Sequence, residues 1–173
     1  MTIPFFDRRN MEFVLYELLD VEQLTEHDYY QEHSRETFNA VIDVSEQLAM
    51  EHFHPHDAKL DDNEPMMENG KVKIIPEVKD AIQFFAEAGF FSGHHSVDLG
   101  GIQLPWVVNQ ACFSIMQAAN INTVGYPLLT IAAANVIEAS ASQELKDIYL
   151  PAMLDGRTFG TMCLTEAQAG SSL

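Results

Sequence analysis

The residues best suited to chemistry lie near the end of the chain, where hydroxyl groups and glycines follow an apolar run. A β-branched and apolar stretch at residues 158–164 comes after an Asp-Gly turn and predicts a strand. A polar turn at residues 165–172 follows directly and carries Thr165, Gly170 and Ser171. Hydroxyls, together with a glycine that lets backbone N–H groups approach a ligand, favour a contact to a phosphate or to the polar edge of a heteroaromatic ring.

This strand would stand alone in the sequence. A single strand leaves its edge hydrogen bonds unpaired, and sheets of fewer than three strands are marginally stable at best in water. We therefore expect the strand to pair with something that this sequence does not contain, or the chain to be a fragment of a longer one.

Upstream of the strand, the sequence predicts a mainly α protein. Apolar residues recur at helical spacing in six segments, whose ends are marked by capping residues, prolines and glycines. We expect helices over residues 10–19, 25–53, 76–89, 105–119, 125–139 and 142–155. The remaining segments are an amino-terminal arm whose Phe5 and Phe6 dock on the body, a polar loop at 58–73, a glycine-bearing loop at 90–104 and a break at 120–124.

Two of these helices carry specific expectations about burial. The segment 125–139 is almost uniformly apolar, which is typical of a helix buried on most sides. The last helix begins after Ser142 as N-cap, and the spacing of its apolar residues predicts that four of them point inward. These four are Leu145, Ile148, Tyr149 and Leu150.

Composition limits the classes of partner. The 173 residues are 47% hydrophobic, which suits one compact domain, and the formal net charge of −17 comes from 26 acidic residues against 9 Lys and Arg. Such an acidic surface repels phosphate backbones, so nucleic acid binding is disfavoured. No apolar run approaches the roughly 18 residues of a membrane span, and no signal peptide is evident, so we expect a cytoplasmic protein without membrane contact.

Cysteines and histidines give no metal or disulfide signal. Cys112 and Cys163 lie far apart and outside any CxxC motif, which predicts buried, reduced thiols. His52, His54 and His56 could in principle chelate a metal, but alternate residues of a helix do not share one face. We expect no metal site and interpret these histidines as residues of a helix carboxyl terminus.

The turn at residues 160–173 (GTMCLTEAQAGSSL) resembles the central signature of the acyl-CoA dehydrogenase family, usually Cys-(Leu/Val/Met)-Thr-Glu-Pro-x-Ala-Gly-Ser-Asp. The likeness extends to residues 10–19 (NMEFVLYELL), 126–130 (YPLLT) and 150–156 (LPAMLDG). Together they resemble the branch that includes the 3-methylmercaptopropionyl-CoA dehydrogenases. One departure lies at Gln103, where the family usually has the third glycine of Tyr-Gly-Gly-x-Gly-Leu-Pro.

The resemblance implies a helical amino-terminal domain at residues 1–156, followed at 157–173 by the first strand of a truncated middle β-domain. Members of the family bind FAD and oxidise the α and β carbons of an acyl-CoA thioester. The implied function is therefore the amino-terminal part of an FAD-dependent oxidoreductase of fatty acid metabolism. The implied partners are the acyl-CoA substrate, an electron-transfer flavoprotein or similar acceptor, and further copies of the full-length protein.

The resemblance also implies roles for individual residues. It places four residues at the flavin edge and two near the FAD pyrophosphate, and Ser171 also resembles a contact to the pantetheine arm of acyl-CoA. These residues are Met162, Cys163, Leu164 and Thr165 at the flavin, and Gly170 and Ser171 at the pyrophosphate. Ala167 replaces the usual proline and Ser172 the usual aspartate, so we expect a looser turn that lacks a bracing carboxylate.

No residue of the chain is assigned as the catalytic base. In the family the base usually comes from the carboxy-terminal domain, which would lie beyond Leu173. Glu166 lies within the motif, but its position implies a structural role, and a base must reach the proton that it removes. We predict that the chain alone does not turn over acyl-CoA.

Two alternative functions remain open at this point. One is a flavin-containing relative without dehydrogenase activity, such as the alkylation-response proteins that associate with DNA. Those proteins use a basic surface, whereas this chain is acidic. The other is a helical module that binds a partner protein.

Overall fold

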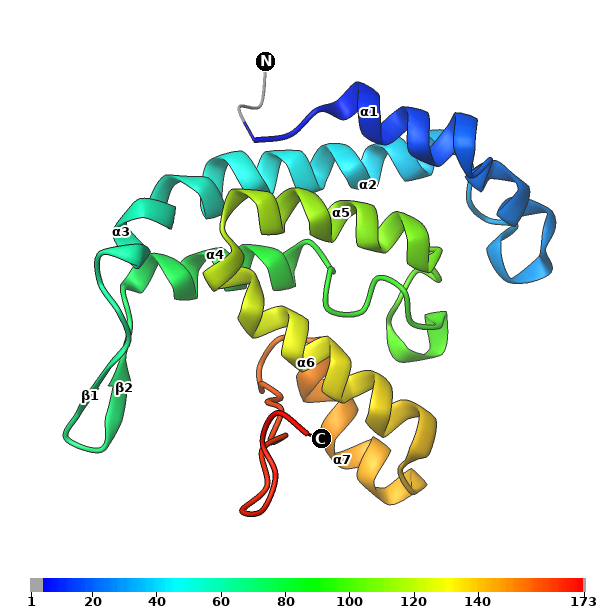
Figure 1. Ribbon diagram of the computed structural model, residues 1–173. Coiled ribbons are helices and arrows are strands. Elements are labelled where there is room, and N and C mark those ends of the chain that lie inside the picture. The colour runs from blue at the N-terminus through cyan, green and yellow to red at the C-terminus, as the bar shows by residue number, and fades with distance from the viewer. Residues whose placement is uncertain (1–4, 173) are drawn as a thin grey trace.

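The computed structural model describes residues 5–172, and within them the chain is mainly helical, with one two-stranded sheet (Figure 1). This confirms the predicted fold class. Short π- and 3-10-helical segments extend or connect several of the α-helices. The elements in order are α1 (Arg8–Glu12), a π-helix (Phe13–Leu18), 3-10 helices (Val21–Glu26 and Asp28–Tyr30), α2 (Arg35–Leu48), a π-helix (Ala49–Phe53), a 3-10 helix (His54–His56), α3 (Asp57–Asp61), β1 (Met66–Glu68), β2 (Lys71–Lys73), α4 (Pro76–Glu87), a 3-10 helix (Val97–Leu99), α5 (Trp106–Ala119), α6 (Ile121–Ser140) and α7 (Gln143–Leu154).

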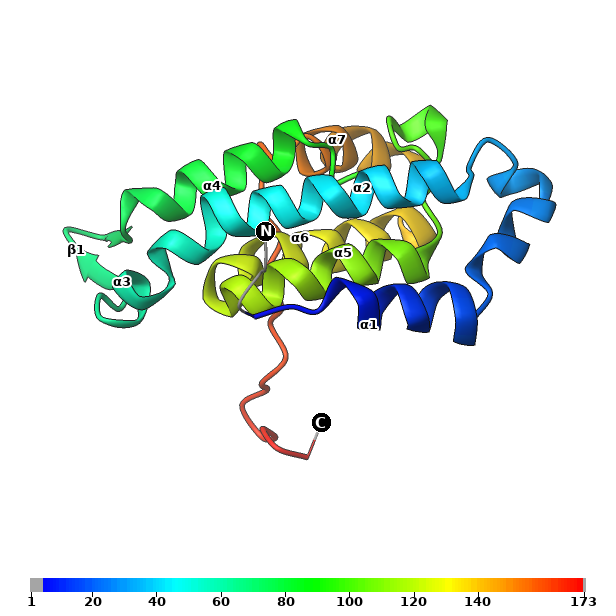
Figure 2. The same cartoon turned by 90° about the horizontal axis from the view of Figure 1, so that it is seen from above.

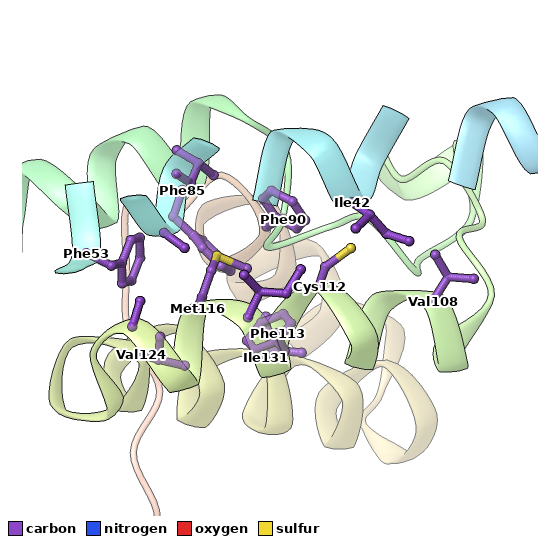
Figure 3. Close-up of a cluster of buried hydrophobic side chains, with 14 of the residues drawn as sticks. Ile42, Phe53, Phe85, Phe90, Val108, Cys112, Phe113, Met116, Val124 and Ile131 are labelled. Carbon is purple, nitrogen blue, oxygen red and sulfur yellow. The ribbon is translucent and has the colours of Figure 1, made fainter. Parts of the chain in front are cut away.

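The helices form two packed groups around a shared core. Helices α4, α2 and α5 lie side by side, and α6 packs beneath α5 and leads into α7 (Figures 1 and 2). Most of the buried apolar side chains lie between α2, α4, α5 and α6, as the close-up in Figure 3 shows. A second, smaller cluster of buried side chains joins α6 to α7.

Phe85 of α4 lies at the centre of the main core. Its side chain is fully buried, and its ring centroid lies 5.0 Å from that of Phe91, 5.4 Å from Phe90 and 5.5 Å from Phe113. The contacts with Phe91 and Phe113 are edge-to-face, an arrangement that aromatic rings favour because of their quadrupoles. These contacts join α4, the loop that follows it and α5.

Several helix ends follow the capping pattern expected from the sequence. The Ser142 side chain accepts a hydrogen bond from the Leu145 amide at the start of α7. Gly89 adopts φ +77° just after α4, a left-handed conformation that ends helices and favours glycine. These two helices have nearly the predicted bounds.

Other helix bounds differ from the prediction because capping side chains lie elsewhere. The expected helix at 25–53 is interrupted, since Ser34 forms a capping box with Thr37 and starts α2 there. The first helix begins at Arg8, because Asp7, and not Asn10, is its N-cap. The break predicted at residues 120–124 is limited to Asn120. The Asn120 side chain caps α6 by accepting a hydrogen bond from the Thr123 amide, so this helix begins at Ile121.

Two burial expectations were wrong. In α7, three of the four residues expected to point inward, Leu145, Ile148 and Tyr149, are exposed, because no other part of the described chain covers that face. Of the four, Leu150 alone is buried. In α6, Val136 is also largely exposed. The apolar spacing marked the helices correctly but did not tell which face packs.

The loop predicted at 58–73 contains a projecting β-hairpin. Strands β1 and β2 pair antiparallel around Asn69 and Gly70, whose φ angles of +51° and +74° give a tight hairpin turn. All six strand residues are exposed. The strand predicted at residues 158–164 is not formed. Residues 159–165 run without regular structure, because within residues 5–172 no neighbouring strand supplies the hydrogen bonds that a strand needs.

The glycine-bearing loop before α5 is held by close backbone contacts. A Cβ atom at Gly101 would lie 2.0 Å from the His95 carbonyl oxygen, so only glycine fits. Gln103, at the position of the family's third glycine, adopts a left-handed φ of +54°. Its side-chain amide donates to the Tyr29 carbonyl at 2.9 Å, which holds the residue in that conformation.

We expect Phe85→Ala to lower the free energy of unfolding by about 3–5 kcal/mol, because it leaves a cavity among four aromatic rings. Phe84→Ala is the matched control. The Phe84 side chain is 40% exposed, and its one aromatic contact within residues 5–172 is with His52, so its loss should cost about 1 kcal/mol or less. Urea denaturation of both variants measures the difference, and equal losses would contradict this account of the core.

Candidate cofactor and substrate site

The chain leaves the helical body at a tightly packed junction. Gly156 adopts φ +68°, and a Cβ there would lie 2.7 Å from the Phe91 ring. The Gly160 amide donates to the Thr130 hydroxyl of α6 at 3.2 Å, and a Cβ at Gly160 would lie 2.5 Å from that of Ala133. The backbone of the exiting segment therefore lies directly on α6, a position that requires glycine.

A cavity of about 580 Å³ lies beside this junction. Its walls come from α6, from the segment before β1 and from residues 159–161. Leu60, Tyr126, Leu129 and Phe159 supply apolar surface. The volume falls in the range of small-molecule pockets, so a bound organic group would fit there.

A second cavity of about 910 Å³ lies between α4 and the end of α7. Ile74, Ile82 and Leu154 contribute to its mainly apolar lining. It shares Tyr126 and Phe159 with the first cavity. These two aromatic side chains therefore line both cavities.

The six residues implied as FAD contacts lie on the segment that follows the junction. This segment extends away from the helical body, and all six residues are exposed (Figure 2). Glu166 and Ala169 exchange backbone hydrogen bonds of 2.9 and 3.2 Å, which closes the turn despite the missing proline. The structure thus brings the six together on one segment, next to the first cavity.

The segment offers many free hydrogen-bond donors. Within residues 5–172, the backbone N–H groups of 161–165 and 170–172 donate to no protein acceptor. Space is open around Gly170, since a Cβ atom there would meet no atom closer than the Thr165 methyl carbon at 3.9 Å. Amide and hydroxyl donors of this kind suit the carbonyl edge of a flavin ring and the oxygens of a pyrophosphate, so the donor set fits FAD.

The two cysteines lie in different environments. Cys112 is buried in α5, where burial raises the pKa of its thiol to about 12, so it is an inert reduced thiol as expected. Cys163 is exposed, and the expectation that it is buried was wrong. The exposed segment at 161–168 leaves it without neighbours that could cover it.

The histidines at the end of α2 have separate neighbours. The His52 ring stacks on Phe84, the His54 ring lies 5.0 Å from Phe5, and His56 is buried with its Nε2 2.8 Å from the Thr123 hydroxyl. Burial lowers the pKa of His56. Nowhere in residues 5–172 do three or more His, Cys, Asp or Glu side chains group so as to hold a metal ion.

Sequence reasoning did not identify Tyr126, Phe159 or the segment before β1 as lining residues. Tyr126 belongs to the YPLLT motif, which indicated the family but not a pocket. Phe159 was interpreted as part of a strand, and the segment before β1 as a polar loop.

No helix in the described part of the chain is both long and apolar enough to cross a membrane.

Comparison with known proteins decides the family. Residues 35–157 match the family model described as acyl-CoA dehydrogenase, N-terminal domain. The chain belongs to the acyl-CoA dehydrogenase family. This confirms the resemblance carried by the sequence motifs.

Two curated relatives illustrate the match. The chain is 38% identical over 107 residues to a 3-methylmercaptopropionyl-CoA dehydrogenase of Ruegeria pomeroyi, which covers 62% of this chain and 18% of that protein. It is 30% identical over 172 residues to a butyryl-CoA dehydrogenase of Syntrophomonas wolfei, covering 97% of this chain and 28% of that protein. The chain thus spans less than a third of the length of these two acyl-CoA dehydrogenases.

We expect Gly160→Ala to lower the free energy of unfolding by about 1–3 kcal/mol, because the added methyl group would overlap Ala133. It should also remove hydrogen-exchange protection from the amide at position 160, which now donates to Thr130. Gly170→Ala is the control, since space is open there and stability should change by less than about 0.5 kcal/mol. An unchanged amide protection in Gly160→Ala would argue against a close contact between this segment and α6.

Proposed function

We propose that this chain is the helical amino-terminal part, residues 1–156, of an FAD-dependent acyl-CoA dehydrogenase, and that residues 157–173 begin its middle β-domain. One observation carries this proposal. Gly160 and Thr161 line the cavity of about 580 Å³ and lead without interruption into the motif residues 162–165. A cofactor held by the motif would therefore lie next to a cavity suited to a substrate.

The motif residues would hold the cofactor through backbone and hydroxyl groups. The amides of 162–165 and the Thr165 hydroxyl would bond the polar edge of the flavin ring. Gly170 and Ser171 would contact the pyrophosphate, and Ser171 also the pantetheine arm of the substrate. When bound, FAD supplies the acceptor for the hydride that leaves the β-carbon of the thioester.

The helical body would contribute one wall of the acyl site. Leu60, Tyr126, Leu129 and Phe159 present apolar surface to the cavity, and burial of an acyl chain against them would be favourable. Holding the chain there would orient its α and β carbons relative to the cofactor. The names of the relatives, butyryl-CoA and 3-methylmercaptopropionyl-CoA dehydrogenase, support a short or sulfur-containing acyl group.

Other parts of the reaction would come from outside this chain. The base that removes the α-proton would belong to a later domain of the longer protein, and Glu166 is not proposed for that role. Electrons would pass to an electron-transfer flavoprotein or similar acceptor, and the longer protein would form homo-oligomers. The 173-residue chain alone should therefore show no turnover of acyl-CoA.

The decisive test is an anaerobic visible spectrum of the longer protein that contains this chain. A flavin spectrum that bleaches when one of a panel of acyl-CoA thioesters is added would support the proposal. Bound flavin that no thioester bleaches would favour a relative without dehydrogenase activity. A colourless protein, with no flavin recovered on reconstitution, would contradict the cofactor assignment.

In that longer protein we expect Thr165→Val to raise the dissociation constant for FAD roughly 2- to 10-fold, because it removes one hydrogen bond to the cofactor. The substitution keeps the shape of the side chain and removes only its hydroxyl. Thr158→Val, at an exposed position between Gly156 and Gly160, is the matched control and should bind FAD like the unmodified protein. Titration of the apoprotein with FAD, followed by flavin fluorescence, measures both constants.

We further expect Tyr126→Ala to shift the preferred acyl group toward longer chains, because it removes an aromatic wall of the cavity. The change should show in KM more than in kcat, since the ring supplies binding surface and no reacting group. Leu128→Ala removes a side chain of the same helix that lines neither cavity, so it should leave the preference unchanged. Kinetics with a series of straight-chain acyl-CoA thioesters would separate the two outcomes.

A further inference from the structure

Two adjacent histidines join the loop before α5 to the second half of α6. His95 is completely buried, and its Nδ1 lies 2.7 Å from Oε2 of Glu138. The Nε2 of the partly buried His94 lies 2.8 Å from Oδ1 of Asn135. Asn135 and Glu138 are three residues apart and therefore share one face of α6.

The partners determine which ring nitrogens carry protons. A carboxylate and an amide oxygen only accept hydrogen bonds, so Nδ1 of His95 and Nε2 of His94 must donate. The other nitrogens, Nε2 of His95 and Nδ1 of His94, are buried and bond to nothing within residues 5–172. A proton added to either nitrogen would be buried without an acceptor there, which is costly.

The two imidazole rings are also close to each other. Their centroids lie 4.1 Å apart, so charging both would place like charges side by side in a mostly buried site. Glu138 is partly exposed and can balance one of the two charges. From α5, the indole of Trp106 packs edge-on against His94 at 4.6 Å and contributes no titratable group.

We propose that His94 and His95 form a proton-sensitive clasp, which holds the loop before α5 on α6 while His94 is neutral and releases it when His94 takes up a proton. The clasp is independent of the proposed function, because it follows from contacts within the helical body. Its consequence extends to the candidate site, since α6 also carries Tyr126 and the Thr130 hydroxyl that binds Gly160.

The direction of the pH effect follows from the burial of His94. Burial lowers the pKa of the His94 imidazole and outweighs the contacts with Asn135 and Glu138, which favour its charged form. In the released state His94 regains the ordinary histidine pKa of about 6.5. The closed clasp is therefore fully favoured above pH 6.5 and loses stability as the pH falls from there toward the lowered value.

Trp106 provides a local probe, because it is the single tryptophan of the chain. A protonated imidazole quenches indole fluorescence, so the emission of the 173-residue protein should fall between pH 8 and pH 5, with a midpoint below about 6.5. In His94→Gln this titration should disappear.

His56→Gln is the matched control. His56 is another buried histidine with a lowered pKa, but its ring nitrogen bonds Thr123, and it makes no aromatic contact with Trp106. This variant should therefore alter the pH dependence of overall stability and leave the Trp106 titration unchanged. A titration that is the same in His94→Gln as in the unmodified protein would overturn the proposal.

Hydrogen exchange tests the release itself. Protection factors correct for the pH dependence of intrinsic exchange. Those in the second half of α6 should fall by up to about tenfold for each pH unit below about 6.5, until the lowered pKa of His94 is reached. The effect should be absent in His94→Gln, while amides of α2 should respond less. Equal protection of the second half of α6 at pH 5 and pH 8 would contradict the clasp even if Trp106 fluorescence titrates.

Discussion

The contact of the Gly160 backbone with α6 is the constraint on which the candidate site depends. A glycine allows the chain to lie against Ala133 and to bond the Thr130 hydroxyl, and any larger residue would have to move away. This contact determines where the motif segment begins. It also places residues 159–161 in the wall of the cavity that Tyr126 and Leu129 line from α6.

The position of α6 is in turn set by the rest of the helical body. Its inner face packs on α5 through Val124 and Ile131 in the main core, and Phe85 links that core to α4. Its second half is held by α7 and by His94 and His95 of the loop before α5. Apolar burial thus positions one half of α6, and apolar and hydrogen-bonded contacts together position the other.

In the proposed assignment the catalytic base belongs to a later part of a longer protein, and this chain supplies binding surface. The helical body offers an apolar wall and a fixed exit point for the chain. The motif offers hydroxyls and amides that donate to no acceptor within residues 5–172. Both are suited to holding and orienting a cofactor and a substrate. The relatives are more than three times as long as the matched region, which leaves ample chain to supply the remaining groups.

The sequence alone determined the helical class, the ends of α4 and α7, and the family, because these depend on local capping and on short contiguous motifs such as GTMCLTEAQAGSS. Only the tertiary structure decided which faces are buried, as Leu145 and Ile148 demonstrate, and which residues line the cavities, as Tyr126 and Phe159 do. The pairing of His95 with Glu138 was likewise invisible, since 43 residues separate the two. The spacing of apolar and capping residues along a chain reflects local backbone preferences, whereas contacts between distant segments form only when the helices pack.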